Sequence, residues 1–182
     1  MSWPLVAQSD SPAATKELAG RLAVLSRSGD IILLIGELGA GKTAFAQGFA
    51  AALGVAGPVT SPTFTLVRQY ACADGAPVGT LIHADVYRTG SLPEVVDLAL
   101  AELVEERAVA LVEWGDLAAP ALGDDALEVT LAQPEDQGTA TGTDESPAAD
   151  RRIITIVGRG SWAARADEVA RALSPSAVGS AP

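Results

Sequence analysis

The 182-residue sequence is poor in residues that form disulfides or bind metals, with one cysteine, Cys72, and one histidine, His83. A single cysteine cannot form a disulfide within the chain, and one cysteine with one histidine cannot build a Cys/His metal cage. No stretch reaches the roughly 18 consecutive apolar residues of a membrane helix. The N-terminus lacks the basic start and apolar core of a signal peptide. We therefore expect a cytoplasmic protein with no membrane partner.

Positive charge is also scarce, since 12 Lys and Arg face 23 Asp and Glu, for a net charge of −11. Between Glu94 and Asp150 there are fifteen carboxylates and one base, Arg107. Affinity for nucleic acid comes largely from Lys and Arg that neutralise phosphates. Such a surface is expected to repel free nucleic acid, so any role at RNA would run through a partner protein. The alternative is an ordinary acidic protein whose charge says nothing of partners.

Apolar residues make up 48% of the chain, which is typical of a globular protein. The short apolar runs Ile31–Ile35 and Val109–Val112 predict strands buried on both faces. Further strands are expected at 5–7, 63–71, 80–83, 126–131 and 153–157, and helices at 12–27, 43–53, within 91–106 and at 163–173. This alternation predicts an α/β fold with a central, mostly parallel sheet, flanking helices and late antiparallel strands. We expect one domain over 1–173, with a mobile acidic loop at 133–150 and a disordered tail at 174–182.

The strongest motif is GELGAGKT, Gly36–Thr43, which matches G-x-x-x-x-G-K-[ST] at every fixed position, between a predicted strand and a predicted helix. Glycines let consecutive backbone N–H groups converge on an anion, and the helix that follows adds its positive end. Lys42 would reach the β- and γ-phosphates, and the Thr43 hydroxyl would bind Mg²⁺. The ATP-binding residues predicted from the loop are Glu37, Leu38, Gly39, Ala40, Gly41, Lys42, Thr43 and Ala44. The alternative is a glycine-rich turn that binds nothing.

The residue types that the chain lacks indicate which nucleotide base it binds. P-loop GTPases typically read guanine through an Asn-Lys-x-Asp element, whereas this chain has no asparagine and only two lysines, Lys16 and Lys42. ATP is therefore favoured over GTP. Replacing Lys42 with alanine should weaken ATP binding and leave the fold intact, because we expect the loop lysine at a surface anion site.

Two acids follow predicted strands, Glu113 after Val109–Val112 and Asp85 after a looser apolar segment. Ligands of open α/β sheets sit at the carboxyl ends of strands, so either carboxylate could hold Mg²⁺ or orient the attacking water. Thr63, in SPTFT, stands where many P-loop proteins carry a switch threonine. The alternatives are solvated acids and ordinary Ser-Pro-Thr turn chemistry.

Four segments occur together in order: GELGAGKT, SPTFTLVRQY, HADVYR and VEWGD. Together they resemble the TsaE family, small bacterial ATPases of tRNA threonylcarbamoyladenosine modification, over roughly residues 11–132. The resemblance implies a P-loop NTPase-like, three-layer fold. It also implies weak, Mg²⁺-dependent ATP hydrolysis that drives or resets a complex with the proteins TsaD and TsaB. It implies that tRNA is reached only indirectly, through that complex.

The resemblance also assigns roles by position. It makes Lys42, Asp85 and Glu113 the catalytic residues, and Thr43 and Glu113 the Mg²⁺ ligands. It makes Thr63 the switch residue and Trp114 an aromatic ring beside the nucleotide, for which core packing is the alternative. His83, Tyr87 and Arg88 could simply brace the switch region. The sequence departs from the family pattern in the length of 133–150 and in Gly115, where a proline is frequent.

Two other functions stay open at this point. A P-loop kinase of a small metabolite would share the size and the loop, but such kinases usually carry an arginine-rich lid, and the segment 133–150 has no arginine. A nucleotide-sensing module without catalysis is the other. In that case, replacing Glu113 with glutamine would leave ATP binding and any measurable turnover unchanged.

Overall fold

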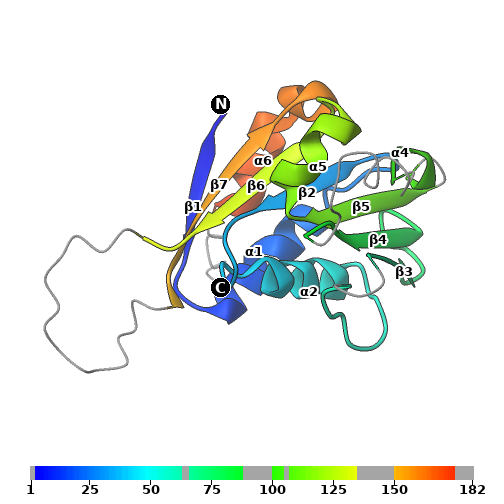
Figure 1. The fold of residues 1–182 in the computed structure, drawn as a ribbon, viewed down its shortest axis with the longest axis horizontal. Coiled ribbons are helices and arrows are strands. Elements are labelled where there is room, and N and C mark those ends of the chain that lie inside the picture. The colour runs from blue at the N-terminus through cyan, green and yellow to red at the C-terminus, as the bar shows by residue number, and fades with distance from the viewer. Residues whose placement is uncertain (1–2, 63–65, 88–99, 105–106, 135–149, 175–182) are drawn as a thin grey trace, which may run out of the picture.

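The structure, a computed structural model, describes residues 3–62, 66–87, 100–104, 107–134 and 150–174. Its strands are β1 (Leu5–Ser9), β2 (Ile31–Ile35), β3 (Val67–Ala71), β4 (Thr80–Asp85), β5 (Ala108–Glu113), β6 (Leu127–Ala132) and β7 (Arg152–Gly158). They form one seven-stranded sheet in the order β1-β7-β6-β2-β5-β4-β3 (Figure 1). The predicted strands at 63–71 and 80–83 correspond to β3 and β4, although residues 63–65 lie outside the described part.

The centre of the sheet is parallel and its edges are antiparallel. Strands β6, β2, β5 and β4 pair in parallel, whereas β7 and β1 at one edge and β3 at the other pair antiparallel. The central strands β2 and β5 are the two apolar runs, and every residue of β5 is buried. The predicted α/β fold with a parallel centre is therefore confirmed, and of the two late strands only β7 is wholly antiparallel to its neighbours.

Helices cover both faces of the sheet and complete the three layers. The helical elements are α1 (Pro12–Ala23), α2 (Lys42–Ala52), α4 (Leu100–Leu103), α5 (Gly115–Leu122), the 3-10 helix η2 (Gly160–Arg165) and α6 (Ala166–Leu173). Side chains alternate along β2, so Ile32 and Leu34 join a buried cluster with α1, α2 and α6, while Leu33 joins a second cluster with α5. None of the described helices combines the length and apolarity that a membrane span requires.

Helix α1 ends at Ala23, four residues before the predicted end at 27. The turn that follows binds the last carbonyls of the helix. The backbone N–H groups of Leu25 and Ser26 donate to the carbonyls of Leu22 and Ala23. The N–H of Arg27 donates to the Asp30 carboxylate at 2.7 Å. This turn forms in place of a further turn of helix because a residue far away in the sequence binds the Asp30 carboxylate.

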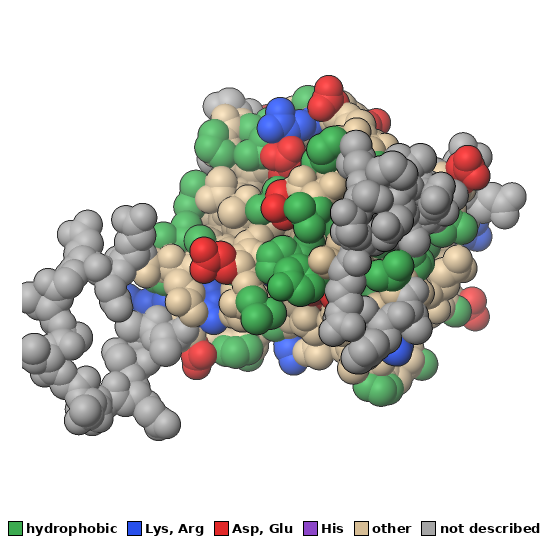
Figure 2. All heavy atoms as spheres, in the orientation of Figure 1, with side chains coloured by type: hydrophobic (Ala, Val, Ile, Leu, Met, Phe, Trp, Pro, Cys, Tyr) green, Lys and Arg blue, Asp and Glu red, His purple; other side chains and the backbone are tan. Residues whose placement is uncertain are grey.

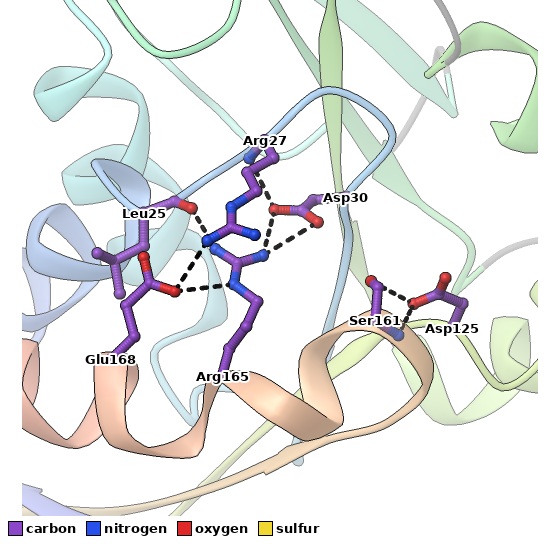
Figure 3. A network of polar contacts seen from close by, with 7 residues as sticks. All are labelled: Leu25, Arg27, Asp30, Asp125, Ser161, Arg165 and Glu168. Atoms are coloured by element: carbon purple, nitrogen blue, oxygen red, sulfur yellow. Dashed lines mark hydrogen bonds and ion pairs between the residues drawn. The ribbon is translucent and has the colours of Figure 1, made fainter.

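That residue is Arg165, where η2 meets α6. Figure 3 shows its guanidinium between the Asp30 carboxylate, the Leu25 carbonyl and Glu168. Arg165 and Asp30 are both about 6% exposed, and their closest N–O distance is 3.0 Å. The guanidinium also lies 3.6 Å from the centre of the buried Trp162 ring. The network ties the C-terminal helix to the turn that leads into β2.

Two helical predictions need correction. The last helix, expected at 163–173, begins as a 3-10 helix at Gly160 and becomes α-helical only at Ala166. Helix α5 was not predicted, because Gly115 and Pro120 disfavour an isolated helix. It forms because Ala118 packs into the second buried cluster against β2. Of the helix or helices expected within 91–106, only α4 falls among the described residues, and most of the 133–150 loop lies outside them.

Candidate functional site

The predicted site residues meet at the carboxyl ends of the parallel strands. Strand β4 ends at Asp85, strand β5 ends at Glu113, and the sheet register places these two acids directly opposite each other. The pairing of β2 with β5 puts Leu34, near the end of β2, beside Glu113. The glycine-rich loop leaves β2 at this edge, so the loop and both acids come together where ligands of α/β sheets bind.

The loop needs glycine where it passes the end of β6. Gly36 has φ of 148°, and a Cβ there would lie 2.4 Å from the Leu131 carbonyl oxygen. Within the loop, the Ala40 N–H donates to the Glu37 carbonyl at 3.1 Å, and the Phe45 N–H donates to the Gly41 carbonyl at 2.9 Å. Helix α2 begins directly after the loop, at Lys42. This is the strand, loop and helix order that the motif predicts.

Lys42 is buried, with 4% of its surface exposed, which differs from the surface position expected from the sequence. Its Nζ donates to the carbonyls of Gly36 at 2.6 Å and Glu37 at 2.8 Å. It also lies 3.8 Å from the centre of the Trp114 ring. Burial lowers the pKa of Lys42, and the nearby carboxylates of Glu113 and Asp85 oppose that shift.

Glu113, at the end of β5, contacts side chains from α2 and from β4. The Thr43 hydroxyl, on α2, lies 3.2 Å from each carboxylate oxygen. The His83 ring, on β4, places Nε2 3.0 Å from Oε1. Because a carboxylate accepts hydrogen bonds, Nε2 carries the hydrogen. His83 is fully buried, and its Nδ1 has no partner among the described residues. The sequence indicated His83 only as a possible brace, so its contact with Glu113 is new.

Asp85 connects the end of β4 to the Ser-Pro turn. One carboxylate oxygen accepts from the Ser61 hydroxyl at 2.5 Å, and the other accepts from the Tyr87 N–H at 3.1 Å. Ser61 belongs to the segment predicted to carry the switch residue. Thr63 itself lies outside the described residues.

Trp114 lines the site and also packs, half-buried, against the second buried cluster. Its ring contacts both the Lys42 ammonium and the Tyr87 ring, whose centroid is 4.5 Å away. The backbone of Trp114 is left-handed, with φ of 61°, at the junction of β5 and α5. Left-handed backbone is uncommon for a bulky residue. The bend directs the chain into α5 directly after Glu113.

These side chains surround a cavity of about 460 Å³. All predicted site residues within the described part line it, except Glu37 and Ala40. Ala40 is buried, and Glu37 takes part through its backbone carbonyl. Ser61 and Tyr87 complete the lining; both belong to predicted motifs, but neither was assigned to the site. A larger hollow of about 940 Å³ between β1, α1 and α6 contains none of the predicted residues.

Charge on the molecular surface agrees with the scarcity of basic residues. On the face drawn in Figure 2, the visible Lys and Arg side chains of the described residues form small, separate groups. The described part of that face therefore offers no broad basic patch of the kind that binds nucleic acid directly.

Comparison with known proteins identifies the family. The model of the family described as threonylcarbamoyl adenosine biosynthesis protein TsaE matches residues 9–141. This chain belongs to the TsaE family. The tRNA threonylcarbamoyladenosine biosynthesis protein TsaE of Streptomyces coelicolor is 40% identical over 154 residues, which cover 84% of this chain and 95% of the relative. The Bacillus subtilis protein of the same name is 40% identical over 126 residues, covering 69% and 76%.

A solved structure supports the same assignment. The crystal structure of YdiB from Bacillus subtilis superposes with a TM-score of 0.69 at 29% identity, covering 94% of this chain and 97% of that one. Membership of the TsaE family makes the chain a nucleotide-binding P-loop protein with a role in threonylcarbamoyladenosine modification of tRNA. The matched region includes the glycine-rich loop and both acids.

Proposed function

We propose that this protein binds ATP with Mg²⁺ in the cavity beside the glycine-rich loop and hydrolyses the nucleotide slowly, as a cytoplasmic, single-domain ATPase. It would act with TsaD and TsaB to drive or reset the complex that modifies tRNA, and would reach tRNA only through that complex. One observation carries the proposal: Lys42 and Thr43 of α2, Asp85 of β4 and Glu113 of β5 line one cavity of about 460 Å³.

The loop supplies the binding of the phosphates. Backbone N–H groups between Gly39 and Ala44, together with the N-terminal end of α2, favour an anion in the cavity. Lys42 is held by two neutral carbonyls. Phosphate oxygens are stronger acceptors for an ammonium than carbonyls are, because they carry charge. Nucleotide binding would therefore draw Nζ away from Gly36 and Glu37 toward the β- and γ-phosphates.

The donor set suits Mg²⁺ bound through a nucleotide. In the part of the chain that the structure describes, no group of three or more His, Cys, Asp or Glu side chains could hold a metal unaided. Mg²⁺ usually takes one or two protein oxygens and completes its shell with water and substrate phosphates. The Thr43 hydroxyl and the Glu113 carboxylate are such oxygens, 3.2 Å apart. The ion, when bound, would neutralise charge on the phosphates.

The two buried acids, Glu113 and Asp85, have different proposed roles. Glu113 is proposed to orient the attacking water and accept its proton, and the hydrogen bond from His83 fixes the direction of its carboxylate. Asp85 positions the Ser61 turn, which leads to the proposed switch residue Thr63. Trp114 would form a wall beside the bound nucleotide.

The scarcity of basic side chains at the cavity favours a low intrinsic rate of ATP hydrolysis. Among the described residues, Lys42 is the one basic side chain that lines the cavity. An arginine that reaches the transferring phosphate accelerates P-loop hydrolysis by about 10³ to 10⁵. Since no arginine of the described residues lines the cavity, slow turnover is expected from the protein alone, and a partner could raise it.

Association and turnover test the proposal together. The purified protein is mixed with the TsaD–TsaB pair with ATP and Mg²⁺, with ADP, and without nucleotide, and complexes are measured by size-exclusion chromatography. We expect association that depends on the nucleotide, and faster release of phosphate in the presence of the pair. Absence of a complex in all three conditions would overturn the partnership. Transfer of the γ-phosphate to a metabolite well above the rate of hydrolysis would favour a kinase instead.

A further inference from the structure

Arg152 brings a guanidinium to the glycine-rich loop from the far end of the sequence. It is the first residue of β7, which runs antiparallel to β6. The start of β7 therefore lies at the same edge of the sheet as the end of β6 and the loop. The Arg152 Nε donates to the Ala40 carbonyl at 2.9 Å, and Nη2 donates to the Gly39 carbonyl at 3.3 Å.

These two bonds constrain the loop because a peptide group is planar and trans. When a carbonyl is held on one side of the chain, the N–H of the next residue points to the other side. Holding the Ala40 carbonyl at Arg152 therefore directs the Gly41 N–H away from the guanidinium. Gly41 lines the proposed nucleotide cavity, and its missing Cβ would lie 4.0 Å from the Arg152 Nε. The guanidinium thus covers the outside of the loop.

The loop needs such an anchor because glycine offers little restraint of its own. Gly39 and Gly41 have φ of 81° and 104°, and a Cβ built at Gly39 would meet nothing within 4 Å. Glycine peptides without packed side chains can rotate, and an ordered cradle binds an anion more tightly than a loose one. Arginine suits this task because its planar fork holds two acceptors in a fixed geometry, whereas the lysine ammonium is a point charge on a flexible stem.

We propose that Arg152 is a positioning residue of the nucleotide site, which holds the Gly39 and Ala40 carbonyls outward so that the loop is ordered for a polyphosphate. The inference rests on the proposed function, since it requires nucleotide in this cavity. Arg152 lies beyond the region 9–141 that the family model matches and belongs to none of the four motifs.

The test compares neighbouring arginines. Arg151 is exposed, and its backbone carbonyl accepts a hydrogen bond from Arg152 Nη1 at 2.7 Å, a bond that does not depend on the Arg151 side chain. Arg151→Met and Arg152→Met therefore remove the same charge from adjacent positions, and Arg152→Lys keeps the charge but not the fork. Affinities for ATP and ADP with Mg²⁺ are measured by calorimetry, KM and kcat by phosphate release, and melting temperature without nucleotide.

Loss of two hydrogen bonds from a charged donor should weaken nucleotide affinity about tenfold in Arg152→Met. We expect less than about a twofold change in Arg151→Met and an intermediate value in Arg152→Lys, since an ammonium keeps the charge but lacks the rigid, planar fork that fixes both carbonyls at once. KM should rise with the dissociation constant, while kcat at saturation changes less than about threefold, because uniform binding is what is lost.

Three results would overturn the positioning role alone: equal losses in the two methionine variants, full affinity in Arg152→Lys, or a lower melting temperature in Arg152→Met with unchanged affinity. The first two would assign the effect to charge, and the third to structure. If Arg152→Met does not fold, the lysine variant still decides between the fork and the charge. Failure of the wild type to bind either nucleotide would overturn the proposed function, and the positioning role with it.

Discussion

Replacing Lys42 with methionine separates binding from folding at the centre of the proposed site. Methionine keeps most of the length and the apolar stem of lysine but loses the ammonium. In the structure that ammonium contacts the Gly36 and Glu37 carbonyls at 2.6 and 2.8 Å and the Trp114 ring at 3.8 Å. The substitution therefore removes three contacts of the nucleotide-free protein and the proposed contact with phosphate.

The effect on folding is a difference between two terms of similar size. Hydrogen bonds from a charged donor contribute roughly 1.5–3 kcal/mol each, and a cation–π contact about 1 kcal/mol. Against these stands the cost of burying an ammonium, several kcal/mol, and burial does lower the pKa of Lys42. We expect the free energy of unfolding without nucleotide to change by less than about 2 kcal/mol, in either direction. A lysine built only to brace the loop would cost more when removed.

The effect on ATP binding should be larger and of one sign. Removing one partner of a buried, hydrogen-bonded charge pair costs about 2–5 kcal/mol, so a loss near 3 kcal/mol weakens affinity more than a hundredfold. ATP titration by calorimetry gives the affinity, and urea unfolding gives the stability. Lys16→Met is the matched control, since Lys16 is the other lysine and is exposed on α1. Unchanged ATP affinity together with a large loss of stability would refute the assignment of Lys42 to phosphate binding.

Four further predictions concern the acids, the metal and the C-terminal network. Glu113→Gln should keep ATP binding and lower kcat by at least about a hundredfold, as expected for a general base; phosphate release with unchanged kcat would remove Glu113 from catalysis. His83→Leu should lower kcat about tenfold with little change in KM, and His83→Gln should recover part of it, because the glutamine amide can donate to Glu113 where leucine cannot. Equal kcat in the two His83 variants would contradict a role through that hydrogen bond. EDTA should abolish phosphate release but leave the melting temperature of the nucleotide-free protein unchanged, since the described residues contain no metal cluster; a fall in that temperature would reveal a structural metal. Arg165→Met should destabilise the fold by about 3–5 kcal/mol in urea, because it removes the ion-pair partner of the buried Asp30 carboxylate. Glu17→Gln, which removes only an exposed ion pair with Arg21, should cost less than about 1 kcal/mol.

Features written in consecutive residues could be predicted from the sequence. The eight residues Gly36–Thr43 specify strand, loop and helix together, because the glycines and the lysine sit in one short segment. The apolar runs of β2 and β5 predict buried parallel strands, and the acid at the end of β5 indicates the edge of the sheet at which ligands bind. Fold class and most of the proposed site follow from such local patterns.

Contacts between distant segments were decided only by tertiary structure. The bond between His83 and Glu113 exists because β4 and β5 are neighbours in register, which no local pattern states. The bonds from Arg152 to Gly39 and Ala40 join residues more than a hundred positions apart, across β6 and β7. Helix α1 ends early because Arg165 secures Asp30 in the following turn. Local propensity sets what each segment can form, whereas strand order and packing decide which side chains meet.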